Sequence, residues 1–210
     1  LKRRAFDNFA AQNRAVTLQD FEAIAYGMPP KFGSLKRVKV SQDPDSFKRN
    51  LNMYVLAEDS NNRLAEANNT LKENLKMWLG NYKMIHDTVD ILDGKIVNFG
   101  VEFHAVASPE FNKFDVLASA QRVLSQHFKQ PLYMGESLYI TDVYRLLNKK
   151  VRGLIDVKSV TIVPKYSGVY SRTTYNFDDQ TSADGRYLNV PDNVCLELKF
   201  AAKDIKGTIE

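Results

Sequence analysis

The clearest pattern in this sequence is the alternation of apolar and polar side chains along Lys95–Ala107. One parity holds Val97, Phe99, Val101, Phe103 and Ala105, and the other holds Asn98, Gly100, Glu102 and His104. Because successive side chains of a β-strand point to opposite faces, this two-residue period predicts a long strand with one buried face. That face must be covered by other elements, which constrains the chain to a layered fold built on a sheet.

Three further segments are typical of strands. Leu35–Ser41 and Asn52–Glu58 are short and rich in β-branched or alternating residues. Leu154–Val163 has the same character, but its apolar parity slips between Val157 and Val160, which predicts a β-bulge at that point.

Two helices are expected ahead of the long strand. Thr17 is a suitable N-cap for the first, which Gly27 and the prolines after it should end. Thr70 and Glu73 have the spacing of a capping box at the start of the second, and Gly80 offers a left-handed stop.

Two more helices are expected after the long strand. Asn112 is a suitable N-cap for the first. The stripe of that helix expected to face the core is Phe114, Leu117, Gln121, Leu124 and Phe128. Thr141 opens the other helix, with Val143, Leu146 and Leu147 facing inward.

The dipeptide Asp93-Gly94 is a turn signal between two apolar segments. A two-residue loop there would put Val89 on the opposite face from Val97. A three-residue loop over Leu92–Gly94 instead pairs Val89 with Val97 and collects the apolar side chains on one side. We therefore expect a hairpin at this turn, which is also a candidate domain boundary.

The order of these elements predicts an α+β fold: two small sandwiches of mainly antiparallel sheet with helices packed on one face. We expect an N-terminal extension over residues 1–16, a first α+β unit over 17–93 and a second over 94–210. Residues 166–193 lack strong periodicity and are expected to form a long insertion resembling a β-hairpin. The start at Leu1 and the abrupt end at Glu210 are typical of a piece of a longer protein.

The insertion is rich in aromatic side chains among polar neighbours. Tyrosine and arginine are enriched in the residues that dominate protein–protein binding. The candidate interface residues are Tyr170, Arg172, Tyr175, Phe177 and Tyr187. The alternative is that these tyrosines lie on their own domain, and the sequence favours neither interpretation.

The sequence lacks the patterns expected of an enzyme. It has no G-x-S-x-G elbow, no H-E-x-x-H, no Walker loop and no G-x-G-x-x-G. A single cysteine, Cys195, excludes an internal disulfide, and His86, His104 and His127 have no metal-ligand spacing. We expect no catalytic, cofactor or metal site and no small-molecule substrate.

Charge and hydropathy bear on other partners. Lys and Arg number ten against five acidic residues in Leu1–Asn50, whereas the rest of the chain carries nineteen against twenty. This basic bias, with the run Lys2-Arg3-Arg4, leaves a nucleic-acid-binding module as the alternative function. No recognised nucleic-acid module accompanies it, and no apolar run approaches the roughly 20 residues that span a bilayer. We therefore expect neither nucleic acid nor membrane as the partner.

Several motifs occur in an order known from a protein family. They are Arg14–Ala25 (RAVTLQDFEAIA), Gly33–Val40 (GSLKRVKV), Val101–Phe103, Leu138–Tyr144 (LYITDVY) and Gly153–Val157 (GLIDV). This order resembles the baseplate J-like proteins of contractile phage tails, over residues 14–165. The long insertion departs from the general family pattern.

The resemblance implies a structural virion protein of the tail baseplate, assembled in the host cytoplasm, with no catalytic or metal-binding residues. Proteins of this kind in baseplate wedges join neighbouring wedges into the ring around the tail tube. The resemblance implies self-association as a homodimer and contacts with other baseplate wedge proteins.

Overall fold

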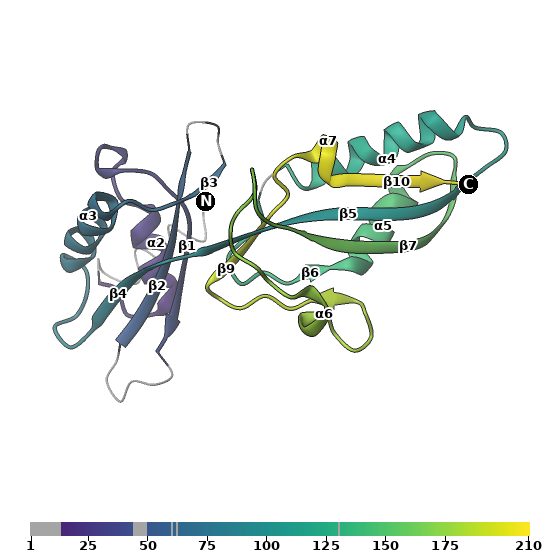
Figure 1. The fold of residues 1–210 in the computed structure, drawn as a ribbon. Coiled ribbons are helices and arrows are strands. Elements are labelled where there is room, and N and C mark those ends of the chain that lie inside the picture. Colours follow the sequence, from purple (N-terminus) through teal and green to yellow (C-terminus); the bar gives the residue numbers. More distant parts are fainter. Residues whose placement is uncertain (1–13, 44–49, 60, 62, 130) are drawn as a thin grey trace. The chain divides into compact units, whose positions relative to one another are not determined.

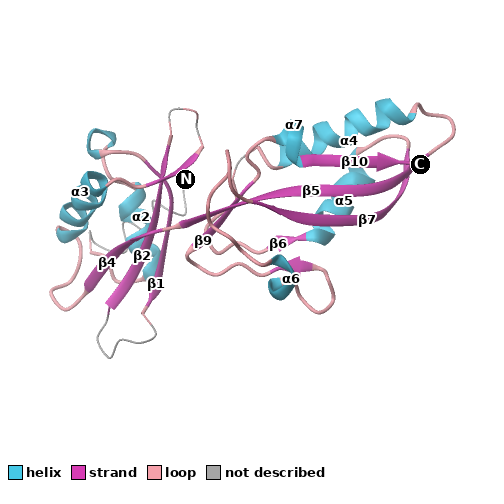
Figure 2. Ribbon diagram, in the orientation of Figure 1, coloured by secondary structure: helices cyan, strands magenta, loops and turns pink. Residues whose placement is uncertain are grey.

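The computed structural model describes residues 14–43, 50–59, 61, 63–129 and 131–210. The basic run Lys2-Arg3-Arg4 and most of the expected N-terminal extension lie outside the described residues. The chain divides into two compact units, the first ending at Gly94 and the second comprising Lys95–Glu210. Each unit has its own sheet and helices (Figures 1 and 2).

The first unit is built around the central strand β2. Its strands are β1 (Leu35–Gln42), β2 (Asn50–Glu58), β3 (Leu64–Glu66) and β4 (Thr88–Asp93). Its helices are α2 (Leu18–Tyr26), the short 3-10 helix η1 (Pro30–Phe32) and α3 (Asn69–Gly80). β2 pairs antiparallel with β1 and β3 and parallel with β4, so the sheet is mixed.

The core of the first unit lies between this sheet and its two longer helices. β2 contributes Leu51, Met53 and Val55, which alternate along the strand as a half-buried strand requires. α3 contributes Leu71, Leu75 and Leu79, spaced four residues apart on one helical face. The Trp78 indole donates a hydrogen bond of 2.9 Å to the Ile24 carbonyl and so ties α3 to α2.

The second unit is built around the central strand β5. Its main sheet consists of β5 (Lys95–Ala107), β7 (Leu154–Lys165), β9 (Val194–Glu197) and β10 (Ile205–Ile209). β7 pairs antiparallel along one side of β5, while β9 and β10 pair parallel with successive parts of its other side. A separate two-stranded sheet joins β6 (Leu138–Tyr139) and β8 (Tyr187–Leu188).

The helices of the second unit are α4 (Lys113–His127), α5 (Ile140–Lys150), α6 (Phe177–Gln180) and α7 (Ala201–Asp204). β5 presents Val97, Phe99, Val101, Phe103 and Ala105 to the core, as its alternation predicts. α4 and α5 bury residues in the same cluster, so both helices cover this face of the sheet (Figure 2).

These features confirm the α+β class and several local predictions. β5 has the bounds that its sequence pattern indicated. The bulge in β7 is confirmed, because His104 pairs with Ser159 and Ala105 with Val157, leaving Lys158 outside the ladder. Thr17 and Asn112 are N-caps, as expected.

The hairpin expected at Asp93-Gly94 is wrong. Val89 pairs with Leu51 and Val97 pairs with Leu196, so each strand joins the sheet of its own unit. The Gly94 N–H donates to the Val55 carbonyl, and the next N–H, that of Lys95, donates to the Asn193 carbonyl. Each unit offers its own buried partner strand, so the local turn signal does not determine the pairing.

Four helix predictions need correction. α5 begins at Ile140 and has Tyr139 at its N-cap position, so Thr141 does not open it. Asn68, not Thr70, caps α3, and its side-chain oxygen accepts from the Leu71 N–H at 2.7 Å. Gly80 lies inside α3 and has no left-handed φ. α4 buries Val116, Ala120 and Leu124, whereas Phe114 is 79% exposed. Both sets in α4 have helical spacing, so periodicity alone could not decide between them.

The insertion 166–193 is hairpin-like only over residues 180–189, where the Asn189 N–H donates to the Gln180 carbonyl and the Ser182 N–H donates to the Tyr187 carbonyl. It also contains α6, and its strand β8 pairs with β6 of the body of the second unit. One isolated antiparallel bridge, Thr181 to Leu188, lies within it. The insertion is therefore bound to the body of the second unit.

Candidate protein-interaction surface

Two tyrosines lie side by side on the outer face of the β6–β8 pair. Leu138 pairs with Leu188 and Tyr139 pairs with Tyr187. The two leucines are buried in the core of the second unit, whereas Tyr139 and Tyr187 are 52% and 40% exposed. The ring centroids of Tyr139 and Tyr187 are 5.8 Å apart, with the ring planes tilted by 43°. We call this pair the tyrosine surface.

Hydrogen bonds along the insertion hold β8 in this position. The Ser182 N–H donates to the Tyr187 carbonyl, and the Thr181 hydroxyl donates to the Phe177 carbonyl at 2.6 Å. Asn176 caps α6 through the Asp178 N–H. These bonds link α6, the turn that follows it and β8. They therefore fix the position of the segment that carries Tyr187.

Tyr175 and Phe177 support this segment from inside. Phe177 is 5% exposed and belongs to the core cluster, so it is not available as an exposed anchor. The Tyr175 ring lies 5.9 Å from the Phe177 ring, and its hydroxyl donates to the Asn189 carbonyl at 2.9 Å. Burial raises the pKa of the Tyr175 phenol above its ordinary value.

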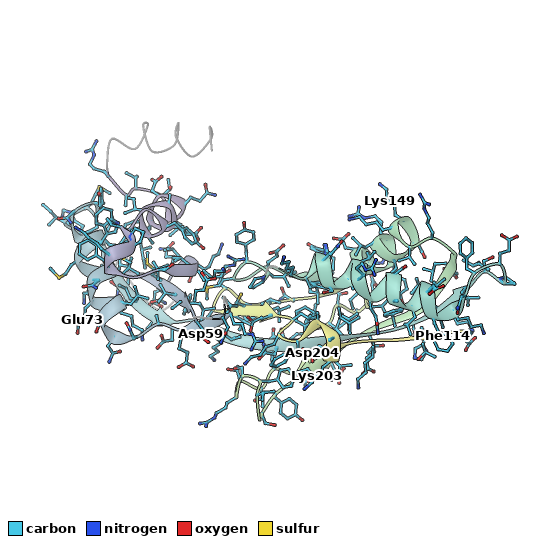
Figure 3. The ribbon with its side chains drawn as sticks, turned by 90° about the horizontal axis from the view of Figure 1, so that it is seen from above. Asp59, Glu73, Phe114, Lys149, Lys203 and Asp204 are labelled. Atoms are coloured by element: carbon cyan, nitrogen blue, oxygen red, sulfur yellow. The ribbon has the colours of Figure 1, made fainter. Side chains whose placement is uncertain are left out.

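Tyr170 belongs to a different part of the second unit. Its hydroxyl donates to the Asp204 carboxylate at 2.6 Å, and its ring meets the Phe200 ring edge-on. Asp204, labelled in Figure 3, is 1% exposed and also accepts from the Phe200 N–H. The bond to Asp204, then burial, then the charge of Asp204 raise the pKa of Tyr170 to about 12.

The structure therefore separates the five candidate interface residues. Tyr187 lies on the tyrosine surface, and Tyr175 and Phe177 pack beneath the segment that carries it. Tyr170 lies in another part of the second unit. Arg172 is exposed. The interface itself stays a prediction. The sequence analysis missed Tyr139, because the pairing of β6 with β8 joins residues far apart in the chain and gives no local signal.

The histidines considered for chemistry do not meet carboxylates in a pocket. His86 and His104 are exposed, and Asp87, next to His86, is buried. His127 lines a hollow of about 390 Å³, in which the other ionisable side chains are Lys129 and Lys150. Within the described ranges, no group of His, Cys, Asp and Glu could hold a metal ion. No helix among those residues is long and apolar enough to cross a membrane.

Comparisons with known proteins identify the fold. No family model and no curated protein matches the chain. Among solved structures, the chain is similar to one in the cryo-EM structure of the anti-feeding prophage baseplate, 6-fold symmetrised. The two superpose with a TM-score of 0.52 at 13% sequence identity, over 94% of this chain and 40% of that chain. At this identity the likeness shows a shared fold, and this chain spans about two fifths of the other chain's length.

Proposed function

We propose that this protein is a structural component of a contractile-tail baseplate that works by binding other proteins rather than by catalysis. The observation that carries the proposal is the fold, which resembles a baseplate chain over 94% of these residues. The sequence motifs in residues 14–165 support the same class of protein. This support is independent of the fold comparison, because it depends only on the residue types of the motifs and on their order along the chain.

The finer proposal concerns the place of the protein in such an assembly. The order of the motifs resembles the baseplate wedge protein of T4-like phages, gene product six. On that basis the protein joins neighbouring wedges into the ring around the tail tube, as a homodimer that also contacts other wedge proteins. A subunit in such a ring needs several interfaces, each of roughly 800 Å² per partner.

We infer that the tyrosine surface belongs to one of these interfaces. Tyr139 and Tyr187 expose large rings with few rotatable bonds, which lose little conformational entropy when a partner covers them. In a homodimer a symmetric contact would use the same surface of both copies. The two tyrosines would then meet the equivalent pair of the partner copy or its immediate surroundings.

Sedimentation velocity across a concentration series tests this proposal. The wild-type chain should show a concentration-dependent dimer, and Tyr139→Ala with Tyr187→Ala should weaken it by about thirtyfold or more, as expected for two central interface residues. Phe114→Ala is the matched control, because Phe114 is an aromatic residue of the same unit, 79% exposed, at the start of α4 (Figure 3). Unchanged dimer affinity in the tyrosine variant, with its fold intact, would refute the assignment of this surface.

A further inference from the structure

The strand β4 lies at an edge of the first sheet and pairs with β2 along one side. The bond from the Gly94 N–H to the Val55 carbonyl shows which residues of β4 direct their main-chain groups toward β2. Alternate residues of a parallel strand bond to the same neighbour, so Asp90 and Leu92 turn their main-chain groups toward β2. Val89, Ile91 and Asp93 consequently turn their N–H and C=O groups toward the outer edge.

Side chains accept from some of the outward N–H groups of two other outer strands, β1 and β7. In β1, the Val38 N–H donates to the Tyr26 hydroxyl at 2.9 Å and the Val40 N–H donates to Glu22 at 3.1 Å. In β7, the Val160 N–H donates to the Tyr144 hydroxyl at 2.8 Å. Among the residues that the structure describes, no group makes such a bond to the outward main chain of β4. Such an edge is a template for another strand.

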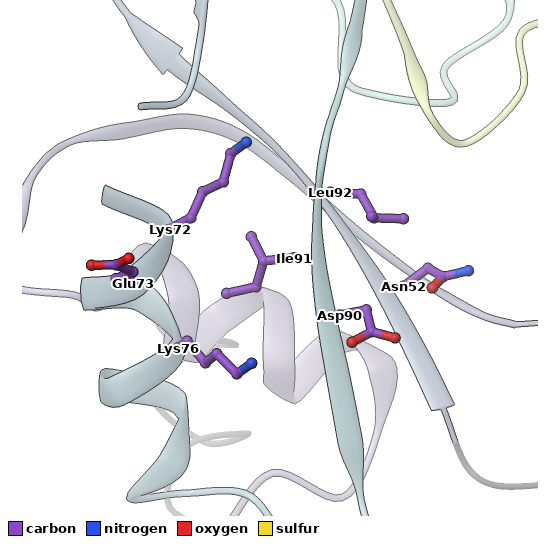
Figure 4. A pocket seen from close by; sticks show the side chains of 7 residues that line it. All are labelled: Asn52, Lys72, Glu73, Lys76, Asp90, Ile91 and Leu92. Carbon is purple, nitrogen blue, oxygen red and sulfur yellow. The ribbon is translucent and has the colours of Figure 1, made fainter. Parts of the chain in front are cut away.

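A hollow of about 340 Å³ lies at β4, and residues of α3, β4 and β2 line it (Figure 4). Ile91 points toward α3, whereas Asp90 and Leu92 lie on the other side of the strand (Figure 4). Lys76 reaches toward β4 from α3, and the Glu73 carboxylate points away from it. The hollow gives an added strand room for side chains near the outward main-chain groups of β4.

The charges around the hollow specify the side chains that fit it. Lys72 is bound to Asp93 at 2.6 Å. Lys76 and Asp90 have no ion pair within the described part of the chain, and they lie on opposite sides of β4. Because successive residues of a strand point to opposite faces, a bound strand would meet both charges with an acidic residue next to a basic one.

We propose that an extended segment of a partner protein binds the first unit as an additional strand along β4. Its main chain bonds to Val89, Ile91 and Asp93, and an acidic residue faces Lys76 while its basic neighbour faces Asp90. Main-chain bonds supply the affinity in this mode of recognition, and the side chains at the two faces supply the specificity. This inference stands apart from the baseplate proposal, since it depends only on the edge of the first sheet.

A displayed library of random peptides, selected on the full chain, tests the proposal. Enriched peptides should carry the acidic–basic neighbours and should slow hydrogen exchange at the Val89 and Ile91 amides by about tenfold or more, with little change at Asp90 and Leu92. Ile91→Pro removes an outward N–H without removing a ladder bond, and it should weaken binding by about tenfold or more. N-methylation of the alternate peptide residues whose N–H groups face β4 should abolish binding.

A second variant keeps the test decisive if Ile91→Pro does not fold. Lys76→Glu should weaken binding of the selected peptides and favour peptides with the acidic residue replaced by lysine, whereas Lys113→Glu, with the same change in net charge, should do neither. The proposal fails if no peptide is enriched, or if the enriched peptides leave the Ile91 amide unprotected. Self-association of this chain through β4, with the same protection pattern, would identify a second copy as the partner and overturn the assignment to another protein.

Discussion

Single tyrosines in this protein serve two different purposes. Tyr144 and Tyr175 use their hydroxyls to bind main-chain groups, and Tyr170 binds a buried carboxylate. Tyr139 and Tyr187 instead leave their rings exposed. The sequence could suggest tyrosines as interface residues. It could not show which hydroxyls are bonded within the protein, because the partners of Tyr144, Tyr170 and Tyr175 lie in distant segments.

Tyr170 should titrate later than an ordinary tyrosine. Its pKa is raised to about 12 from 10.0, so a phenolate absorbance titration should show a late component that Tyr170→Phe removes. The unfolded chain loses this proton near pH 10 and the folded chain keeps it to about 12. The stabilising contribution is therefore complete below pH 10 and is lost as the pH rises toward 12. An unchanged late component in Tyr170→Phe would contradict this.

Gly153 should resist substitution more than another left-handed glycine. Its φ is +82°, and an added Cβ would lie 2.6 Å from a Phe111 ring carbon. Gly185 has φ +64° with no atom within 4 Å of such a Cβ. Gly185→Ala should therefore cost about 1 kcal/mol of the free energy of unfolding, and Gly153→Ala at least about 1 kcal/mol more. Urea unfolding measures both, and equal costs would show that Phe111 moves aside freely.

Among the elements, the long strand β5 was easier to locate than the first residue of α3, whereas the short strands β3, β6, β8, β9 and β10 were not located from the sequence. The period of two along β5 extends over the whole strand, so its bounds follow from many residues at once. A helix start depends on one capping residue, and Asn68 and Thr70 are both suitable. With Asn68 as the cap, α3 starts at Asn69, two residues earlier than it would with Thr70 as the cap.

Substitution at the two candidate caps of α3 should separate them. Asn68→Ala removes the acceptor of the Leu71 N–H and should lower the free energy of unfolding by about 1 kcal/mol. Thr70→Ala should change it by less than about 0.5 kcal/mol, since Thr70 lies in the first turn of the helix and makes no cap. Thermal or urea unfolding checks the pair, and the reverse ranking would restore the capping box.

At the scale of the whole molecule, the chain builds two separate cores. One cluster draws only on residues up to Val89 and Ile91, and the other only on residues from Val97 onward. The sequence suggested a boundary at Asp93, and the structure divides the chain between Gly94 and Lys95. Each core has its own central strand and at least two covering helices, as an independently folding domain requires.

The second unit should fold without the first. A fragment comprising Lys95–Glu210 contains its whole core cluster and should unfold cooperatively in urea with native-like circular dichroism. A shorter fragment beginning at Val101 loses Val97 and Phe99 and should not fold stably. A non-cooperative transition for Lys95–Glu210 would show that the first unit is needed for its stability.

Features that depend on neighbouring residues could be predicted from the sequence. These are the α+β class, the faces of β5, the bulge in β7 and the N-caps Thr17 and Asn112. Each follows from a local period or from a side chain that bonds to a nearby main-chain group, so no knowledge of distant partners is needed.

Which distant segments meet is seen in the tertiary structure and could not be predicted from local patterns. The tertiary structure paired β4 with β2 instead of β5, brought Tyr139 beside Tyr187 and buried Phe177. It also left the outer main chain of β4 without a hydrogen-bond partner among the described residues. Pairing between distant strands depends on the total apolar area that each arrangement buries, and many arrangements agree with the same local pattern. The candidate interface and the outer edge of β4 both depend on which of these strand pairings forms. The sequence alone therefore could not define them.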